Sequence, residues 1–137
     1  MFERHLQSWG LTADGEPIAT RNSRLLPVRR DKAPAMIKIA IDAEEKRGDA
    51  LMSWWDGKGA ARVLEFDGDA LLLERAIGSS SLKEMVRQGQ DDDASRIICG
   101  VAAELHAPRQ RPRPKLFPLE IWFGDLEGAG GFGFDGE

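Results

Sequence analysis

One charged residue stands in the middle of an otherwise apolar segment. The run AMIKIA, residues 35–40, has the residue types of a buried strand, and Lys38 is its single charged member. Burying an ammonium group is unfavourable unless an anion lies beside it, and in proteins that anion is usually a phosphate or a carboxylate. The following segment opens with the paired acids Glu44 and Glu45. The sequence therefore predicts a strand and a helix that are linked through one lysine.

The composition is typical of one soluble domain. Of the 137 residues, 42% are hydrophobic and 31% are charged, and a chain of this length can bury one core. The formal net charge of −4 argues against a nucleic-acid partner, because no sustained basic stripe with interleaved aromatic residues occurs. The one basic run, PRQRPRPK at residues 108–115, alternates with proline. This run predicts an extended, solvated linker.

Signals for a disulfide, a metal site or a membrane span are weak. Cys99 lies on the apolar side of a helical pattern, which predicts a core role rather than a nucleophile. His5 and His106 have no companions at metal-ligand spacing, so we expect no metal site. The chain shows no signal peptide and no run near the ~18 apolar residues of a membrane span. We therefore expect a cytoplasmic protein with no membrane partner.

Short alternating runs near the start of the chain predict a hairpin. Asp14-Gly15 is a turn signal, and the runs on either side of residues 21–23 alternate with the period of a strand. The second run, RLLPVRR, contains Pro27, which favours an edge or bulged strand because proline has no amide hydrogen to donate. Residues 31–34 then turn the chain into the lysine strand.

A capping box marks the start of the next helix. Asp42 is a good N-cap, and Glu45 completes the box three residues later. Two glycines, at positions 57 and 59, predict where this helix ends. The runs ARVLEF and ALLLERA follow, and the Asp-Gly-Asp sequence between them predicts a second hairpin.

Further helices are predicted in the second half of the chain. Ser81 and Glu84 form another capping box, which predicts a short helix closing near Gly89. Apolar residues then recur at helical spacing from Ala94 to Leu105, so we expect a long helix that packs as a core element. The segment PLEIWF is a candidate for a short amphipathic helix. The order of elements predicts an α+β fold, with an antiparallel sheet of about five strands and helices toward one end.

Several of these segments occur together in one known family. The lysine strand, SRLLPVRR, WWDGKGAARVLEFDGDALLLERA, LHAPR and PLEIWF resemble the nucleotide-binding lobe of the kinase-like aminoglycoside and hydroxyurea phosphotransferases, especially their streptomycin kinase branch. The resemblance runs from about residue 9 to residue 123. It implies a protein-kinase-like N-terminal lobe with one helix against its sheet. The implied divisions are a lobe at 1–76 with its hinge at 74–76, a helical linker region at 77–107, a proline-rich linker with a short helix at 108–127, and a disordered tail at 128–137.

The resemblance also implies which residues would hold ATP. Lys38 would bind the phosphates and form a salt bridge with Glu44, while Glu45 is explained by its capping box. Relatives generally place this glutamate deeper in the helix, where this chain has Gly48 and Asp49. Ser23 would reach a phosphate through its hydroxyl or backbone amide. The carbonyl of Glu74 and the amide of Ala76 would contact adenine. Plainer explanations stay open for each position: a lysine that snorkels to water, a turn serine, and an ordinary strand end.

The catalytic half of that family is missing from these residues. Phosphoryl transfer in the family needs an HGD-type loop with the catalytic aspartate and a later aspartate that holds magnesium. Neither motif occurs in the 137 residues. We therefore expect no catalytic residue and no metal ligand in this chain, and negligible catalysis by the chain alone. ATP, with Mg²⁺, would be the cofactor of the complete enzyme.

Two hypotheses about function follow. The first is the ATP-binding part of a phosphotransferase for a small antibiotic-like molecule, which would bind its substrate only in the complete enzyme. The second is a non-catalytic interaction or regulatory module that kept the lobe. A cloned fragment, a frameshifted gene and a standalone module all stay open. In each case we expect an exposed apolar patch at the hinge and C-terminal face, including Trp122 and Phe123, that supports self-association.

Overall fold

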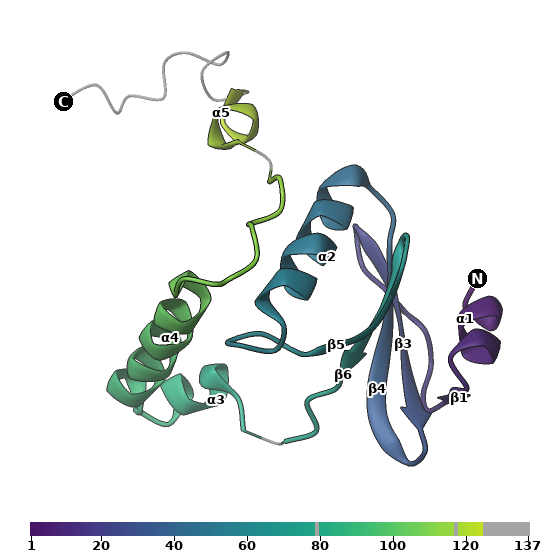
Figure 1. The fold of residues 1–137 in the computed structure, drawn as a ribbon. Helices are drawn as coiled ribbons and strands as arrows, with labels where there is room; N and C mark the ends of the chain where they lie inside the picture. Colours follow the sequence, from purple (N-terminus) through teal and green to yellow (C-terminus); the bar gives the residue numbers. More distant parts are fainter. Residues whose placement is uncertain (79, 117, 125–137) are drawn as a thin grey trace.

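The computed structural model describes residues 1–78, 80–116 and 118–124 of the chain (Figure 1). A six-stranded antiparallel sheet comes first and most of the helices follow it, so the fold is α+β as predicted. The predicted tail at 128–137 lies outside the described residues. In chain order the elements are α1 (Glu3–Ser8), β1 (Thr12–Ala13), β2 (Ile18–Ala19), β3 (Ser23–Arg30), β4 (Ala33–Ala40), α2 (Ala43–Trp55), β5 (Val63–Asp67), β6 (Ala70–Glu74), α3 (Leu82–Arg87), α4 (Asp91–His106) and α5 (Leu119–Trp122).

The lysine strand β4 is central in the sheet. The strand order is β1-β3-β4-β6-β5, and β2 also pairs with β3. β3 and β4 are joined by Asp31 and Lys32, which both have positive φ angles of 50° and 71°. Two such residues in succession give a tight hairpin turn whose twist matches that of the strands. This turn fixes the register that places Lys38 opposite Leu25 on one side and Leu71 on the other.

Pro27 does not lie in an edge strand, which differs from the sequence expectation. It pairs with Met36 of β4, while its carbonyl accepts a hydrogen bond of 2.8 Å from the backbone amide of Asp14. The carbonyl and the nitrogen of one strand residue point to the same side, so the missing donor faces the outer strands. On that side of β3, β1 has ended and β2 has not yet begun at the position of Pro27. The sheet therefore tolerates a residue without an amide hydrogen, because the neighbouring strand is interrupted at this point.

Helices cover both faces of the sheet. Figure 1 shows α1 on one side of the strands and α2 on the other. Only one helix against the sheet was predicted from the sequence, and α1 was not predicted. Its segment packs Phe2, Leu6 and Trp9 against the main core, which includes the fully buried Ile37. Because side chains alternate across a strand, Ile37 faces α1 and Lys38 faces α2.

The ends of α2 follow the predicted signals. The Asp42 side chain accepts a 2.8 Å hydrogen bond from the backbone amide of Glu45, which confirms the N-cap. At the other end Asp56 adopts a left-handed conformation with φ 52°, and Gly57 continues the turn. Gly59 leaves room for α4, because a Cβ atom there would lie 3.1 Å from the Glu104 side chain.

The helices after the sheet are only partly packed. Ser81 caps α3 by accepting from the Glu84 amide, as predicted. The prediction that α4 is a core element is wrong for most of its length: among its described residues only Ala94 is buried, and Ile98 is 53% exposed. Cys99 is exposed as well, which corrects its expected core role. In the described part of the chain, α4 meets α3 and the end of α2, and these contacts leave its apolar side open.

The proline-rich run is bound rather than solvated over its first part. The Arg109 guanidinium donates to the carbonyl of Leu105 in α4 and to that of Lys58 after α2, each at 2.9 Å. It also lies over the Trp54 ring, 5.1 Å from its centre. Trp54 in turn donates to the carbonyl of Arg111. Arginine can bridge the carbonyls left free at two helix ends, and the sequence reading of a free linker overlooked this role.

None of the described helices is long and apolar enough to span a membrane. The short helix predicted in PLEIWF is present as α5.

Candidate functional site

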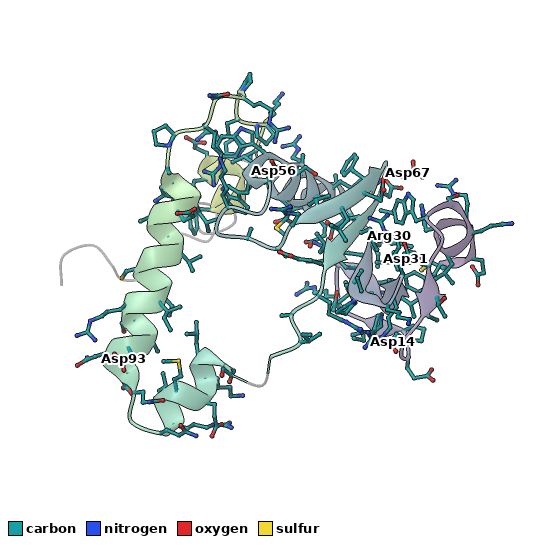
Figure 2. All side chains as sticks on the ribbon, turned by 60° about the horizontal axis from the view of Figure 1, so that its bottom comes forward. Asp14, Arg30, Asp31, Asp56, Asp67 and Asp93 are labelled. Carbon is teal, nitrogen blue, oxygen red and sulfur yellow. The ribbon has the colours of Figure 1, made fainter. Side chains whose placement is uncertain are left out.

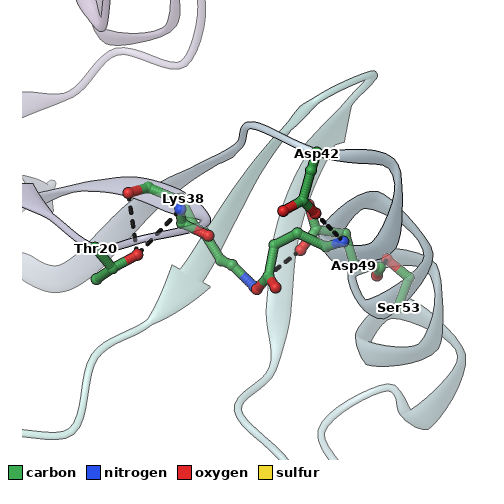
Figure 3. A network of polar contacts seen from close by, with 7 residues as sticks. Thr20, Lys38, Asp42, Asp49 and Ser53 are labelled. Atoms are coloured by element: carbon green, nitrogen blue, oxygen red, sulfur yellow. Dashed lines mark hydrogen bonds and ion pairs between the residues drawn. The ribbon is translucent and has the colours of Figure 1, made fainter. Parts of the chain in front are cut away.

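The site is built around the ammonium group of Lys38. Its nitrogen lies 2.6 Å from Oε1 of Glu45 and 3.1 Å from Oδ1 of Asp49 (Figure 3). The Lys38 side chain is 17% exposed, so the strand lysine predicted to need an anion has two of them. The Lys38 ammonium is paired with two carboxylates within the fold, so the side chain does not simply snorkel to water.

The capped helix explains why these two acids meet the lysine. Residues four apart lie on the same face of a helix, so Glu45 and Asp49 both point toward β4. The predicted salt bridge with Glu44 is wrong, because one residue along a helix turns the side chain by about 100°. Glu45 was explained by its cap alone, but the cap uses its backbone amide and leaves its carboxylate free. Asp49 was not the chosen partner, although the resemblance had indicated a deeper position in the helix, at Gly48 or Asp49, and Asp49 lies 3.1 Å from Lys38.

The two acids differ in their surroundings. The Asp49 side chain is 1% exposed, whereas that of Glu45 is 29% exposed. Burial raises the pKa of Asp49, and the nearby Lys38 charge opposes this only in part. Neither carboxylate oxygen of Asp49 receives a hydrogen bond from the described residues, so its contact with Lys38 is an ion pair by distance.

The pKa of Lys38 is raised by its two partners. Burial alone would lower it, because a buried ammonium loses its hydration. The hydrogen bond from Lys38 to Glu45 and the negative charge of Asp49 together outweigh that effect. The lysine therefore stays charged at neutral pH. A fixed, charged ammonium on a central strand is a group that can bind an anionic ligand.

Thr20 holds the turn before Ser23, the residue predicted to reach a phosphate. Its hydroxyl donates to the Ser23 carbonyl at 3.1 Å and accepts from the Ser23 amide at 3.0 Å. Ser23 itself is buried at the start of β3, opposite Ala40 at the end of the lysine strand. Of the two routes predicted for Ser23, the backbone amide is already bonded within the loop. A phosphate role for its hydroxyl stays a prediction.

The predicted hinge borders a separate hollow. Glu74 ends β6, and its backbone amide and carboxylate both bond to Arg62 beside β5, at 3.0 Å and 2.8 Å. Ala76 is exposed. Both residues line a hollow of about 540 Å³, together with the loop after α2 and Val101 of α4. Lys38 does not line it, so the structure brings together the lysine and its acids but leaves the predicted adenine contacts untested.

A further ion cluster next to the hinge was missed by the sequence analysis. Asp14, between β1 and β2, accepts from Arg75 at 2.6 Å and from Arg29 at 3.0 Å. The hydrogen bond from Arg75 is the main cause that lowers the pKa of Asp14. Asp14 appeared in the sequence as a turn signal, and nothing local marks a contact with a residue 61 positions away. The cluster joins the first hairpin to the hinge.

No group of three or more histidine, cysteine or carboxylate side chains in the described part of the chain is placed to hold a metal ion.

Several known proteins are similar to this chain in sequence. A model of the family described as aminoglycoside/hydroxyurea antibiotic resistance kinase matches residues 8–130. A streptomycin 3''-kinase of Klebsiella pneumoniae is 49% identical over 121 residues, which cover 88% of this chain and 46% of that protein. A streptomycin 6-kinase of Streptomyces glaucescens is 34% identical, over 77% of this chain and 34% of its own length.

A hydroxyurea phosphotransferase of Kitasatospora aureofaciens is 33% identical, over 76% of this chain and 32% of its own length. The chain therefore spans less than half the length of these relatives. The comparison with solved structures gave no match. The resemblance predicted from the lysine strand and the neighbouring segments is confirmed, and the chain belongs to the aminoglycoside/hydroxyurea antibiotic resistance kinase family.

Proposed function

We propose that this chain is the ATP-binding part of a phosphotransferase that modifies a small antibiotic of the aminoglycoside or hydroxyurea type. The observation that carries the proposal is the fixed ammonium of Lys38, held at 2.6 Å by Glu45 and at 3.1 Å by Asp49. Family membership adds that relatives of the same sequence type are named as kinases. The substrate class comes from those names alone.

The residues present suit the phosphate end of a nucleotide. Lys38 supplies a positive charge whose position is set by the capped helix α2, and a phosphate carries the opposite charge. The nucleotide supplies the phosphoryl group when bound. The hinge offers the Glu74 carbonyl and the Ala76 amide for the base, beside the 540 Å³ hollow. The backbone amide and the carboxylate of Glu74 already bond to Arg62, so the carbonyl is the group of Glu74 that is left to contact the base.

The chain contributes binding rather than chemistry in this proposal. No HGD-type loop occurs among the 137 residues, and without a general base or metal ligands the phosphoryl group has no activated acceptor. We therefore expect no detectable phosphorylation of streptomycin or hydroxyurea by the isolated chain. The remaining catalytic groups would come from a part corresponding to the length of the relatives that this chain does not cover.

The test is an isothermal titration of the chain with magnesium-ATP. Wild type should bind, and Lys38→Ala should lose binding. Lys46→Ala is the matched control, because Lys46 also pairs with an acid, Asp69 at 2.9 Å, but lies outside the Lys38 cluster. Lys38→Met keeps the apolar stem and should lose binding as well, and a thermal melt of each variant shows whether a loss comes from misfolding. Equal affinity of wild type and both Lys38 variants would contradict the proposal.

A second candidate is an interaction module, and the open side of α4 favours it. Ile98 and its apolar neighbours in α4 are exposed, as is Phe123, while the side chain of Trp122 lies outside the described part. The occupant expected from the sequence is a second copy of the chain. Light scattering during the same titration separates the candidates: no nucleotide affinity with concentration-dependent dimers would favour this module, and a monomer at high concentration would contradict it.

A further inference from the structure

Two carboxylates share one ammonium in the Lys38 cluster. One positive and two negative groups give the cluster a net charge of −1 when all three are ionised. One acid is enough to fix a lysine in place. The second makes the cluster repel the phosphate that the proposed function requires it to bind.

The two acids are not equivalent in their freedom to move. Asp49 has a short side chain that is 1% exposed, so its carboxylate stays beside Lys38 within the fold. Glu45 is longer and 29% exposed, and its fixed part is the backbone amide bonded to Asp42. Its carboxylate can therefore swing into solvent without disturbing the helix cap.

Position matters as much as freedom. Figure 3 shows Lys38 extending from its strand toward α2, with acids of that helix around its nitrogen. Asp49 holds the inner side of the ammonium. Glu45 occupies the more solvent-accessible side, with its oxygen at the shorter distance of 2.6 Å. An anion arriving from solvent meets Glu45 first.

We propose that Glu45 is a displaceable gate that neutralises Lys38 in the empty site and competes with phosphate, while Asp49 is the permanent positioning residue. This inference rests on the proposed function, because it assumes that Lys38 binds phosphate. It predicts an unusual result: removing the charge of one acid strengthens binding, and removing the charge of the other weakens it.

The experiment compares three variants with wild type: Glu45→Gln, Asp49→Asn and Glu44→Gln. Each is titrated with magnesium-ATP and, separately, with magnesium tripolyphosphate, which tests the lysine without the adenine contacts. Glu45→Gln should tighten both by about threefold, the size expected for losing one partly exposed ion pair. Asp49→Asn should weaken both, because Lys38 loses its fixed partner. Glu44→Gln is the matched control, since it removes the same charge one residue away.

The two proposals can fail separately. The gate is judged by tripolyphosphate: equal or weaker binding by Glu45→Gln than by wild type, or no binding by either, would overturn it. The proposed function is judged by whether ATP binding depends on Lys38. Glu45→Gln is the decisive variant because its partly exposed side chain can change without opening the core, and thermal melts of all variants confirm that they are folded.

Discussion

The sheet half of the molecule and the helical half bury their apolar side chains differently. In the sheet half, α1 and α2 cover the two faces of the sheet, and Ile37 is buried on the α1 face and the acid Asp49 on the α2 face. In the helical half, α4 has a clear apolar stripe but leaves Ile98 and its neighbours exposed. Figure 2 shows the separation, with Asp93 on α4 far from Asp14 on the sheet.

This difference indicates which half can stand alone. A region whose core is enclosed gains its stability from its own residues, whereas an uncovered apolar stripe gains little until something packs on it. The three side chains of the Lys38 cluster, Lys38, Glu45 and Asp49, all lie in the sheet half. The site is therefore carried by the part of the chain that needs no partner to be ordered.

The largest expected effect tests this contrast directly. Ile37→Ala should lower the free energy of unfolding by about 3 kcal/mol, because it leaves a cavity in a fully packed core. Ile97→Ala, in the exposed stripe of α4, is the matched control and should change it by less than about 0.5 kcal/mol. Urea unfolding measures both. Similar losses for the two variants would show that α4 is buried in solution.

The second prediction concerns the charge buried in the sheet half. Lys38→Ala leaves Asp49 buried without its partner and should lower the free energy of unfolding by about 2 kcal/mol at pH 7, less than for a fully buried pair because Lys38 and Glu45 are partly exposed. The loss should be smaller at about pH 4, close to the ordinary pKa of an aspartate, because the raised pKa of Asp49 favours its protonated form there.

The sign follows from the raised pKa of Asp49. In the native state this group binds a proton more tightly than in the unfolded chain, so its contribution to stability falls as pH rises through its native pKa. In Lys38→Ala the positive charge that opposes the raised pKa of Asp49 is gone, so Asp49 destabilises the variant more as pH rises. Urea unfolding at both pH values measures it, and a loss that is equal at the two values would contradict the burial of an ionised Asp49.

Local signals in the sequence were enough for most of the sheet half. The caps at Asp42 and Ser81 depend on residues three positions apart, and both were predicted correctly. The lysine in an apolar strand correctly indicated a nearby anion. The choice among the helix acids failed because it depends on the rotation of α2 against the sheet, which packing determines and no short motif records.

Long-range contacts could not be predicted. The bond from Arg75 to Asp14 joins residues 61 positions apart, and the Arg109 contacts join the ends of two helices through an otherwise linker-like run. The expected burial of α4 failed for a different reason. Its apolar period was real, but a period shows which side is apolar and not whether anything covers it.

The smallest effect we predict lies where the two halves meet. Arg109→Ala removes the donors to Leu105 and Lys58 and should lower the free energy of unfolding by about 1 kcal/mol. Hydrogen exchange should show faster exchange at the C-terminal end of α4, with β4 unchanged. Arg113→Ala, an exposed arginine in the same run, is the matched control. If both variants leave α4 equally protected, the halves are not joined through Arg109, and the end of α4 is held by its other contacts, among them the hydrogen bond from Trp55.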